Sequence, residues 1–148
     1  MNVRAPSERL PSNGSDRRAS RVLGALLLLY AAVSLLHFSH NAEYLADYPN
    51  LPAWLSRATV YFAWCGAALL GITGYVLYRR AYRRLGLLLL LVYALIGFDG
   101  LLHYRLAPFS VHTGMMNFTI WAEVLAAALL LAAVISTALR RREVALAH

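Results

Sequence analysis

The sequence predicts an all-α fold, an integral membrane four-helix bundle whose N-terminus and C-terminus are both cytoplasmic. Two observations on the 148 residues lead to this fold class: apolar residues gather in four long runs, and arginines cluster in alternate connections between the runs. The chain is 60% hydrophobic and only 14% charged, whereas a soluble domain carries about 25% charged residues. An apolar run of about 20 residues is long enough to cross a membrane as a helix.

One domain of four spans, residues 21–139, accounts for most of the chain. Residues 1–20 contain Pro, Ser, Asn, Gly and Arg, so we expect a flexible cytoplasmic tail. Residues 140–148 are expected to form a second cytoplasmic tail. The predicted spans cover about residues 22–40, 57–78, 85–104 and 116–139.

The first span begins with the apolar run Val22–Leu36 and reaches the far membrane surface near His40. The connection that follows carries aromatic residues of the kind that lie at the level of the lipid headgroups. We therefore expect this connection to lie on the membrane surface. Its aromatic residues are Tyr44, Tyr48 and Trp54.

The second and fourth spans show signs of close helix packing. Small residues allow neighbouring backbones to approach. The second span contains Gly66, Gly71 and Gly74, and the fourth contains the alanine-rich stretch Ala126–Ala133. The third span has a very apolar first half, Leu87–Val92, and a polar second end.

The distribution of arginine predicts the orientation. The net charge of +7 comes from arginine alone among the basic residues, since the sequence has no lysine. Arginines cluster before the first span, between the second and third, and after the fourth, whereas the other two connections hold only Arg57 and Arg105. This is the positive-inside pattern, so connections 41–57 and 105–116 are expected outside. The charge then reflects topology and attraction to membrane lipid, and we exclude nucleic acid as a partner.

Ionisable side chains gather at one predicted depth, near the outer membrane face. Such groups are costly inside a membrane and are therefore expected to have partners or a function. His37 and His40 are three residues apart and share a helix face, as do Asp99 and His103, four apart. His112 lies in a connection, where a histidine is commonly exposed. The full set is His37, His40, Glu43, Asp99, His103, His112 and Glu123.

The first hypothesis for this set is a metal site that acts on a lipid-like or apolar substrate. Histidine and carboxylate ligands suit zinc or iron. In this hypothesis Asp99 does not bind the metal but orients His103. The ligands would be His37, His40, His103 and either Glu123 or Glu43.

Three alternatives remain open. His37 or His40 facing His103 could ligate haem for electron transfer. A pocket without metal could bind a lipid, or Asp99 and Glu123 could act there as catalytic groups that, with the histidines, shuttle a proton on an apolar substrate. The polar layer could instead only fix helix packing in a non-catalytic subunit, with a homo-oligomer or another membrane protein as partner.

The sequence contains no H-E-x-x-H, C-x-x-C, P-loop or G-x-S-x-G motif that would identify an enzyme. The lysine-free, Ala/Leu-rich composition is typical of high-GC bacteria, so we expect the bacterial inner membrane.

Overall fold

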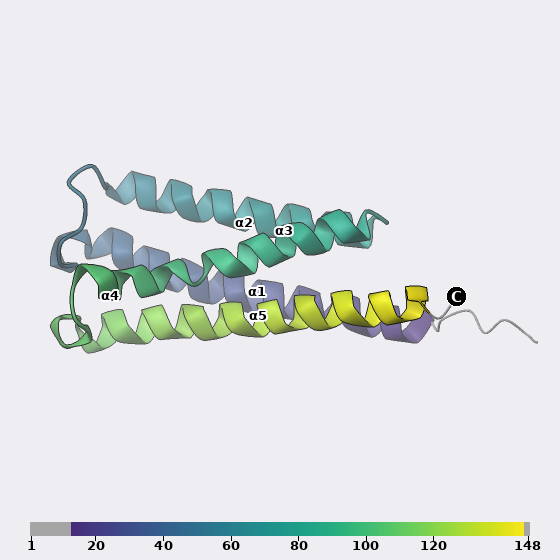
Figure 1. The fold of residues 1–148 in the computed structure, drawn as a ribbon. Helices are drawn as coiled ribbons and strands as arrows, with labels where there is room; N and C mark the ends of the chain where they lie inside the picture. Colours follow the sequence, from purple (N-terminus) through teal and green to yellow (C-terminus); the bar gives the residue numbers. More distant parts are fainter. Residues whose placement is uncertain (1–12, 147–148) are drawn as a thin grey trace, which may run out of the picture.

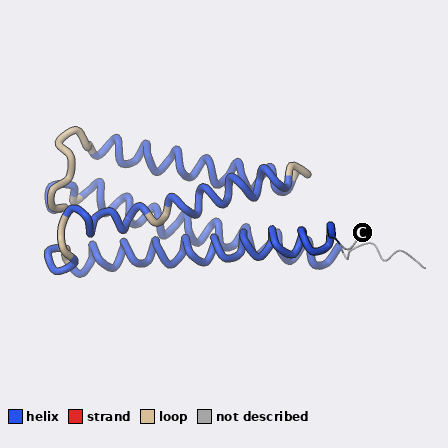
Figure 2. Tube along the Cα trace, in the orientation of Figure 1, coloured by secondary structure: helices blue, strands red, loops and turns tan. Residues whose placement is uncertain are grey.

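The computed structural model describes residues 13–146, and long helices dominate this part of the chain (Figures 1 and 2). Four helical segments are long and apolar enough to cross a membrane, as the sequence predicts. Two 3₁₀ turns, η1 (Leu45–Asp47) and η3 (Phe109–Val111), lie in the connections. The helices are α1 (Asn13–Glu43), α2 (Arg57–Arg79), α3 (Arg83–Ile96), the 3₁₀ segment η2 (Asp99–Leu102), α4 (His103–Leu106) and α5 (Gly114–Leu146).

The first and last helices extend beyond the predicted spans. Residues 13–20, expected in a flexible tail, form the start of α1, and α5 continues past residue 140 to Leu146. Asp16 explains part of this extension, because an acidic residue in the first turn of a helix interacts favourably with the helix dipole. Its carboxylate also forms an ion pair of 2.7 Å with Arg83 at the start of α3. The rest of the predicted tails, residues 1–12 and 147–148, lies outside the described residues.

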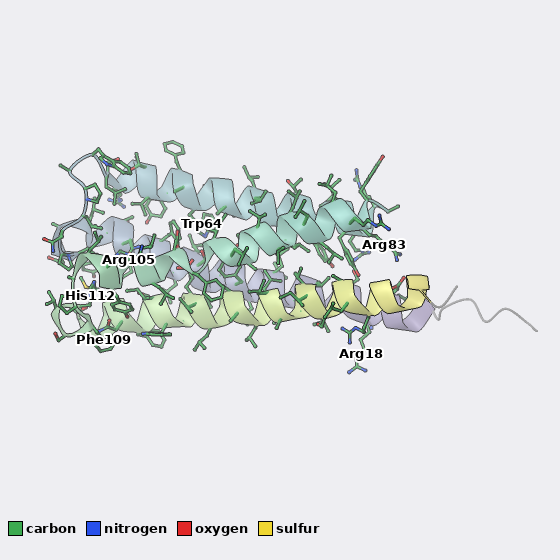
Figure 3. The ribbon with its side chains drawn as sticks, viewed as in Figure 1. Arg18, Trp64, Arg83, Arg105, Phe109 and His112 are labelled. Atoms are coloured by element: carbon green, nitrogen blue, oxygen red, sulfur yellow. The ribbon has the colours of Figure 1, made fainter. Side chains whose placement is uncertain are left out.

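Consecutive long segments run antiparallel and close into a ring in which α1 contacts α2 and α5, and α3 contacts α2 and α5. Figure 1 shows the α2–α3 turn at the same end of the bundle as the start of α1 and the end of α5. We call this the arginine end, after Arg21, Arg79 and Arg83. The opposite end holds the two longer connections. We call it the histidine end, after His103, the first residue of α4, and His112, which Figure 3 shows at this end.

An apolar core fills the middle of the bundle. Tyr30 of α1 and Tyr93 of α3 are almost fully buried, with ring centroids 4.5 Å apart. Leu90 and Leu130 are fully buried in the same cluster. At Gly86 an added Cβ would collide with the backbone of α2, so glycine is what allows α2 and α3 to approach so closely. Tight packing is the main source of stability when the surrounding solvent is as apolar as the core.

The predicted third span is interrupted. α3 ends at Ile96, Gly97 and Phe98 form a turn, and η2 and α4 continue to Leu106. A Cβ on Gly97 would lie 2.5 Å from Cβ of Ala127 and 2.6 Å from the hydroxyl of Tyr30. The backbone can therefore come this close to α1 and α5 only because residue 97 is glycine. A 3₁₀ segment has three residues per turn instead of 3.6, so the interruption changes which side chains of residues 99–106 share a face.

Candidate functional site

Polar side chains from α1, α4 and α5 meet inside the histidine end of the bundle. Three of them, His37, Thr119 and Glu123, are almost fully buried, with exposed fractions of 1%, 1% and 0%. Buried polar groups are costly unless they are paired. We call the set His37, Asn41, His103, Thr119 and Glu123 the central cluster.

His37 and Glu123 form the deepest pair of the central cluster. Nε2 of His37 lies 3.5 Å from Oε2 of Glu123. The buried Ser34 hydroxyl of α1 also lies near this carboxyl, yet neither Glu123 oxygen has a hydrogen bond of good geometry within residues 13–146. The structure thus places His37 opposite Glu123.

The neighbours of His37 identify which ring nitrogen carries the proton. The Thr119 hydroxyl donates to the carbonyl oxygen of Met116 (3.1 Å), so its oxygen is left to accept from Nδ1 of His37 (3.2 Å). In the neutral ring Nε2 is then an acceptor, and it accepts from the amide of Asn41 at 3.1 Å. Nε2 of His37 and Oε2 of Glu123 are consequently two acceptors that face one another. A proton or another cation between them would remove the conflict.

Asn41 connects the two histidines of the central cluster. Its Nδ2 lies 3.1 Å from Nε2 of His37 and 3.4 Å from Nε2 of His103, and an amide nitrogen has two hydrogens to donate. The two imidazole rings meet edge to face, with centroids 5.7 Å apart. The Oδ1 atom of Asn41 is buried and has no hydrogen-bond partner in the described part of the chain. The sequence prediction did not include Asn41, although its position four residues after His37 indicates the same helix face.

The two connections close over the central cluster. Tyr48, expected at the lipid headgroups, is instead 4% exposed, with its ring centroid 5.0 Å from that of His103. A hydrogen bond of 2.8 Å joins its hydroxyl to Nδ1 of His40, and burial raises the pKa of the Tyr48 phenol to about 12. His112, expected in water, is 5% exposed and lies against Tyr104 and His103. The loops at this end (Figure 3) therefore belong to the site.

Two of the predicted metal ligands make other contacts. Glu43 forms an ion pair with Arg57 (2.6 Å) and accepts from the hydroxyl of Tyr61 (2.8 Å), so it links α1 to α2. His40 is engaged with Tyr48, as described above. The structure thus brings His37, His103 and Glu123 together and directs His40 and Glu43 to the periphery.

Asp99 is not placed against His103. The two residues are four apart, which aligns them in an α-helix, but Asp99 begins the 3₁₀ segment η2. Four residues of a 3₁₀-helix overshoot a full turn by a third of a turn. Asp99 is exposed on the flank of the bundle, and no hydrogen bond or ion pair within residues 13–146 joins it to His103.

The arrangement as it stands is not that of a metal centre. Within residues 13–146 no three His, Cys, Asp or Glu side chains are grouped so that they could hold a metal ion. His37, His103 and Glu123 would do so only after the Asn41 amide moved out from between the two rings. Bis-histidine ligation of haem would need His37 and His103 to separate as well, because their edge-to-face contact leaves no room for a porphyrin between them.

Comparison with known proteins identifies no family for this chain. No protein-family model matches it, and no curated protein or solved structure matches it.

Proposed function

We propose that the protein is a multi-pass membrane protein of the bacterial inner membrane, with both termini in the cytoplasm and the histidine end at the outer face. Four helices of sufficient length and apolarity support insertion. The concentration of arginine at the opposite end supports this orientation through the positive-inside rule. Reporter fusions after residue 148 and within the 107–113 connection test it, and equal cytoplasmic activity of both fusions would contradict it.

We further propose that the central cluster is a proton-exchange site for an apolar, lipid-like molecule. The observation that carries this proposal is the pair of facing acceptors, Nε2 of His37 and Oε2 of Glu123, 3.5 Å apart and buried. Each can hold a proton and neither can do so without affecting the other, since they share one site. A buried carboxyl with no hydrogen-bond partner in the described chain is also free to accept from a hydroxyl or amine of a bound molecule.

The proposed step moves one proton and breaks no other bond. The Glu123 carboxyl, in its acid form, donates its proton to a basic atom of the bound molecule and becomes a carboxylate. The replacement proton comes from water by way of Asp99: it passes to Nε2 of His37, which hands it on to Glu123 and returns to the neutral ring held by Thr119 and Asn41. The exposed Asp99 lies beside the cluster on the interrupted third span. A Cβ added to the next residue, Gly100, would lie 3.7 Å from both Nε2 of His37 and Oε2 of Glu123. We assign Asp99 the exchange of protons at the flank of the bundle.

The test compares Glu123→Gln with Glu43→Gln, an acid on the same end that takes no part in the cluster. Infrared spectroscopy of the purified protein should show the carbonyl band of a protonated carboxylic acid, which Glu123→Gln removes and Glu43→Gln retains. Mass spectrometry should find a membrane-derived apolar molecule that co-purifies with the wild type and with Glu43→Gln but is lost from Glu123→Gln. If Glu123→Gln retains both the band and the molecule, the proposal is wrong.

A metal ion is the second candidate occupant, because the Nε2 atoms of two histidines are directed at one amide group. With Asn41 displaced, His37, His103 and Glu123 provide two nitrogen ligands and one oxygen ligand, a set that suits zinc or iron with an open position. Elemental analysis of protein purified without chelator, beside a His37→Ala/His103→Ala variant, tests this candidate. Stoichiometric metal that is lost in the variant would support a metal site, and equal metal content in the two proteins would contradict it.

A further inference from the structure

The arginine end contains a pocket that the proposed function does not use. It has a volume of about 350 Å³ and opens between the first turns of α1, the last turn of α2 and the first turn of α3. Figure 3 shows Arg18 and Arg83 at this end of the bundle, far from His112. The residues that line the pocket are Asp16, Arg17, Ser20, Arg21, Tyr78, Arg79 and Arg83.

The pocket has an excess of positive charge. Four arginines line it and one aspartate opposes them. Asp16 is 2.7 Å from Arg83, whereas Arg17, Arg21 and Arg79 have no carboxylate partner among the residues whose side chains are described. Guanidinium groups from two helices therefore face one space in which Asp16 is the single acid among the residues that line it. Planar guanidinium groups match the geometry of phosphate oxygens, which they bind with two hydrogen bonds at once.

A buried hydroxyl in the same lining also lacks a partner. The Oγ atom of Ser20 is inaccessible and makes no hydrogen bond within the described chain, while the backbone carbonyl of Ser20 accepts from the hydroxyl of Tyr75 at 3.1 Å. A buried polar atom without a partner is costly. An anion that enters the pocket and reaches this wall would supply the acceptor that the Ser20 hydroxyl lacks.

The surroundings favour a lipid over a soluble anion. The pocket lies at the ends of candidate membrane spans, which is the level of lipid headgroups in a bilayer. Immediately toward the middle of the bundle, the same three helices expose apolar side chains on which acyl chains can lie. These side chains are Val22 of α1, Val76 of α2 and Leu85 of α3.

We propose that this pocket binds the phosphate headgroup of an anionic phospholipid, with Arg21, Arg79 and Ser20 as direct contacts. Basic pockets between membrane helices are a recurring site for such headgroups. The site is separate from the central cluster, so it does not depend on the function proposed for the histidine end.

The experiment measures lipid binding by native mass spectrometry on the full-length protein in detergent, with phosphatidylglycerol as the probe and phosphatidylcholine as the zwitterionic comparison. The test variant is Arg21→Gln/Arg79→Gln. The control is Arg18→Gln/Arg80→Gln, which removes the same charge from α1 and from the residue that follows α2, at positions outside the pocket lining. At the usual contribution of one basic residue to anionic lipid binding, the test variant should bind phosphatidylglycerol about 30-fold more weakly. The control should change binding by about twofold or less.

Three results would overturn the proposal. An equal loss of affinity in the test and control variants would mean that diffuse surface charge attracts the lipid. Equal affinity of the wild type for phosphatidylcholine and phosphatidylglycerol would mean that the arginines do not select an anionic headgroup. Competition by inorganic phosphate or glycerol 1-phosphate at the concentration at which the lipid itself binds would assign the pocket to a soluble phosphate.

A second pair of variants keeps the test valid if the double variants do not fold. Arg79→Gln and Arg80→Gln change neighbouring exposed side chains, so neither should disturb packing. Arg79→Gln should weaken phosphatidylglycerol binding about fivefold, and Arg80→Gln should leave it unchanged. Equal effects of the two single changes would also overturn the proposal.

Discussion

The apolar core and the central cluster belong to the same four-helix bundle but differ in how well their buried side chains are packed and hydrogen-bonded. In the core, Tyr30, Leu90 and Leu130 are buried among other apolar and aromatic side chains. In the cluster, a fully buried Glu123 faces the acceptor nitrogen of His37, and neither carboxyl oxygen has a hydrogen bond in the described chain. Departures from good packing and hydrogen bonding are expected where a protein carries its function. The core therefore accounts for stability, and the cluster is the place where a ligand or proton completes the structure.

The sharpest test of this difference compares Leu130→Ala with Glu123→Gln. Leu130 is fully buried, so its truncation should leave a cavity and lower the free energy of unfolding by about 2–5 kcal/mol. Glu123→Gln keeps the shape of the side chain and removes a carboxyl that has no hydrogen bond in the described chain, so it should change stability by less than about 1 kcal/mol. Thermal unfolding in detergent measures both, and the co-purification assay measures the bound molecule.

Leu130→Ala should lose stability and keep the bound molecule. Glu123→Gln should keep its stability and lose the bound molecule. If Glu123→Gln instead unfolds as readily as Leu130→Ala, the central cluster is a structural element. That result would favour the non-catalytic subunit over the proton-exchange site.

The second largest expected change in stability concerns the close helix contact at the interruption of the third span. Gly97→Ala should lower stability by about 1–3 kcal/mol, because the new Cβ would lie 2.5 Å from Cβ of Ala127 and 2.6 Å from the Tyr30 hydroxyl. The matched control is Gly66→Ala in α2, where nothing lies within 4 Å of the added Cβ. Since glycine is unfavourable inside a helix, the control should raise stability by up to about 1 kcal/mol. Opposite signs in thermal unfolding are expected, and a loss in both variants would contradict the packing argument.

The fold was predictable from the sequence because its signals are long and periodic. Apolar runs of about 20 residues identify spans whatever their neighbours are, and the four predicted spans all contain a long helix. The interruption after Ile96 was not predictable in the same way, since Leu85–Phe98 reads as one continuous apolar run. The interruption lies where Gly97 packs closely against Ala127 and Tyr30, residues that are distant in sequence.

The candidate site was predictable only in part, for a related reason. His37, His103 and Glu123 are conspicuous because ionisable residues are rare inside apolar runs, and the structure brings these three together. The pairing of Asp99 with His103 depended on helical periodicity that the 3₁₀ segment does not preserve. The burial of Tyr48 and His112 depends on how two connections fold back over the helices, and short irregular segments have no periodicity from which to infer this.

A smaller effect tests whether the first connection is part of the site. Tyr48→Phe removes the hydrogen bond of 2.8 Å to His40 and should cost about 1 kcal/mol of stability. Tyr44→Phe, at an exposed position of the same connection, is the control and should be neutral.

The Tyr48 bond should also depend on pH. Burial raises the Tyr48 pKa from 10.0 to about 12 in the folded protein, so the folded state holds the phenol proton more tightly than the unfolded state does. The stabilising contribution is complete below about pH 10 and is lost as the pH rises through about 12. The stability difference between wild type and Tyr48→Phe should accordingly shrink over that interval. A difference that stays constant from pH 9 to about 12 would argue that Tyr48 is solvated.

The smallest effect compares the turns at the two ends of the bundle. Ala81, between α2 and α3 at the arginine end, has φ of 75°, and Asn50, in the first connection, has φ of 57°. Alanine in this left-handed region is strained, so Ala81→Gly should raise stability by about 0.5–1 kcal/mol. Asparagine tolerates the region, and Asn50 also donates to the carbonyl oxygen of Leu106 at 2.8 Å. Asn50→Gly should therefore lower stability by up to about 1 kcal/mol. If both changes stabilise the protein in thermal unfolding, the Asn50 bond contributes nothing, and the connections at the histidine end are held by Tyr48 and His112 without its help.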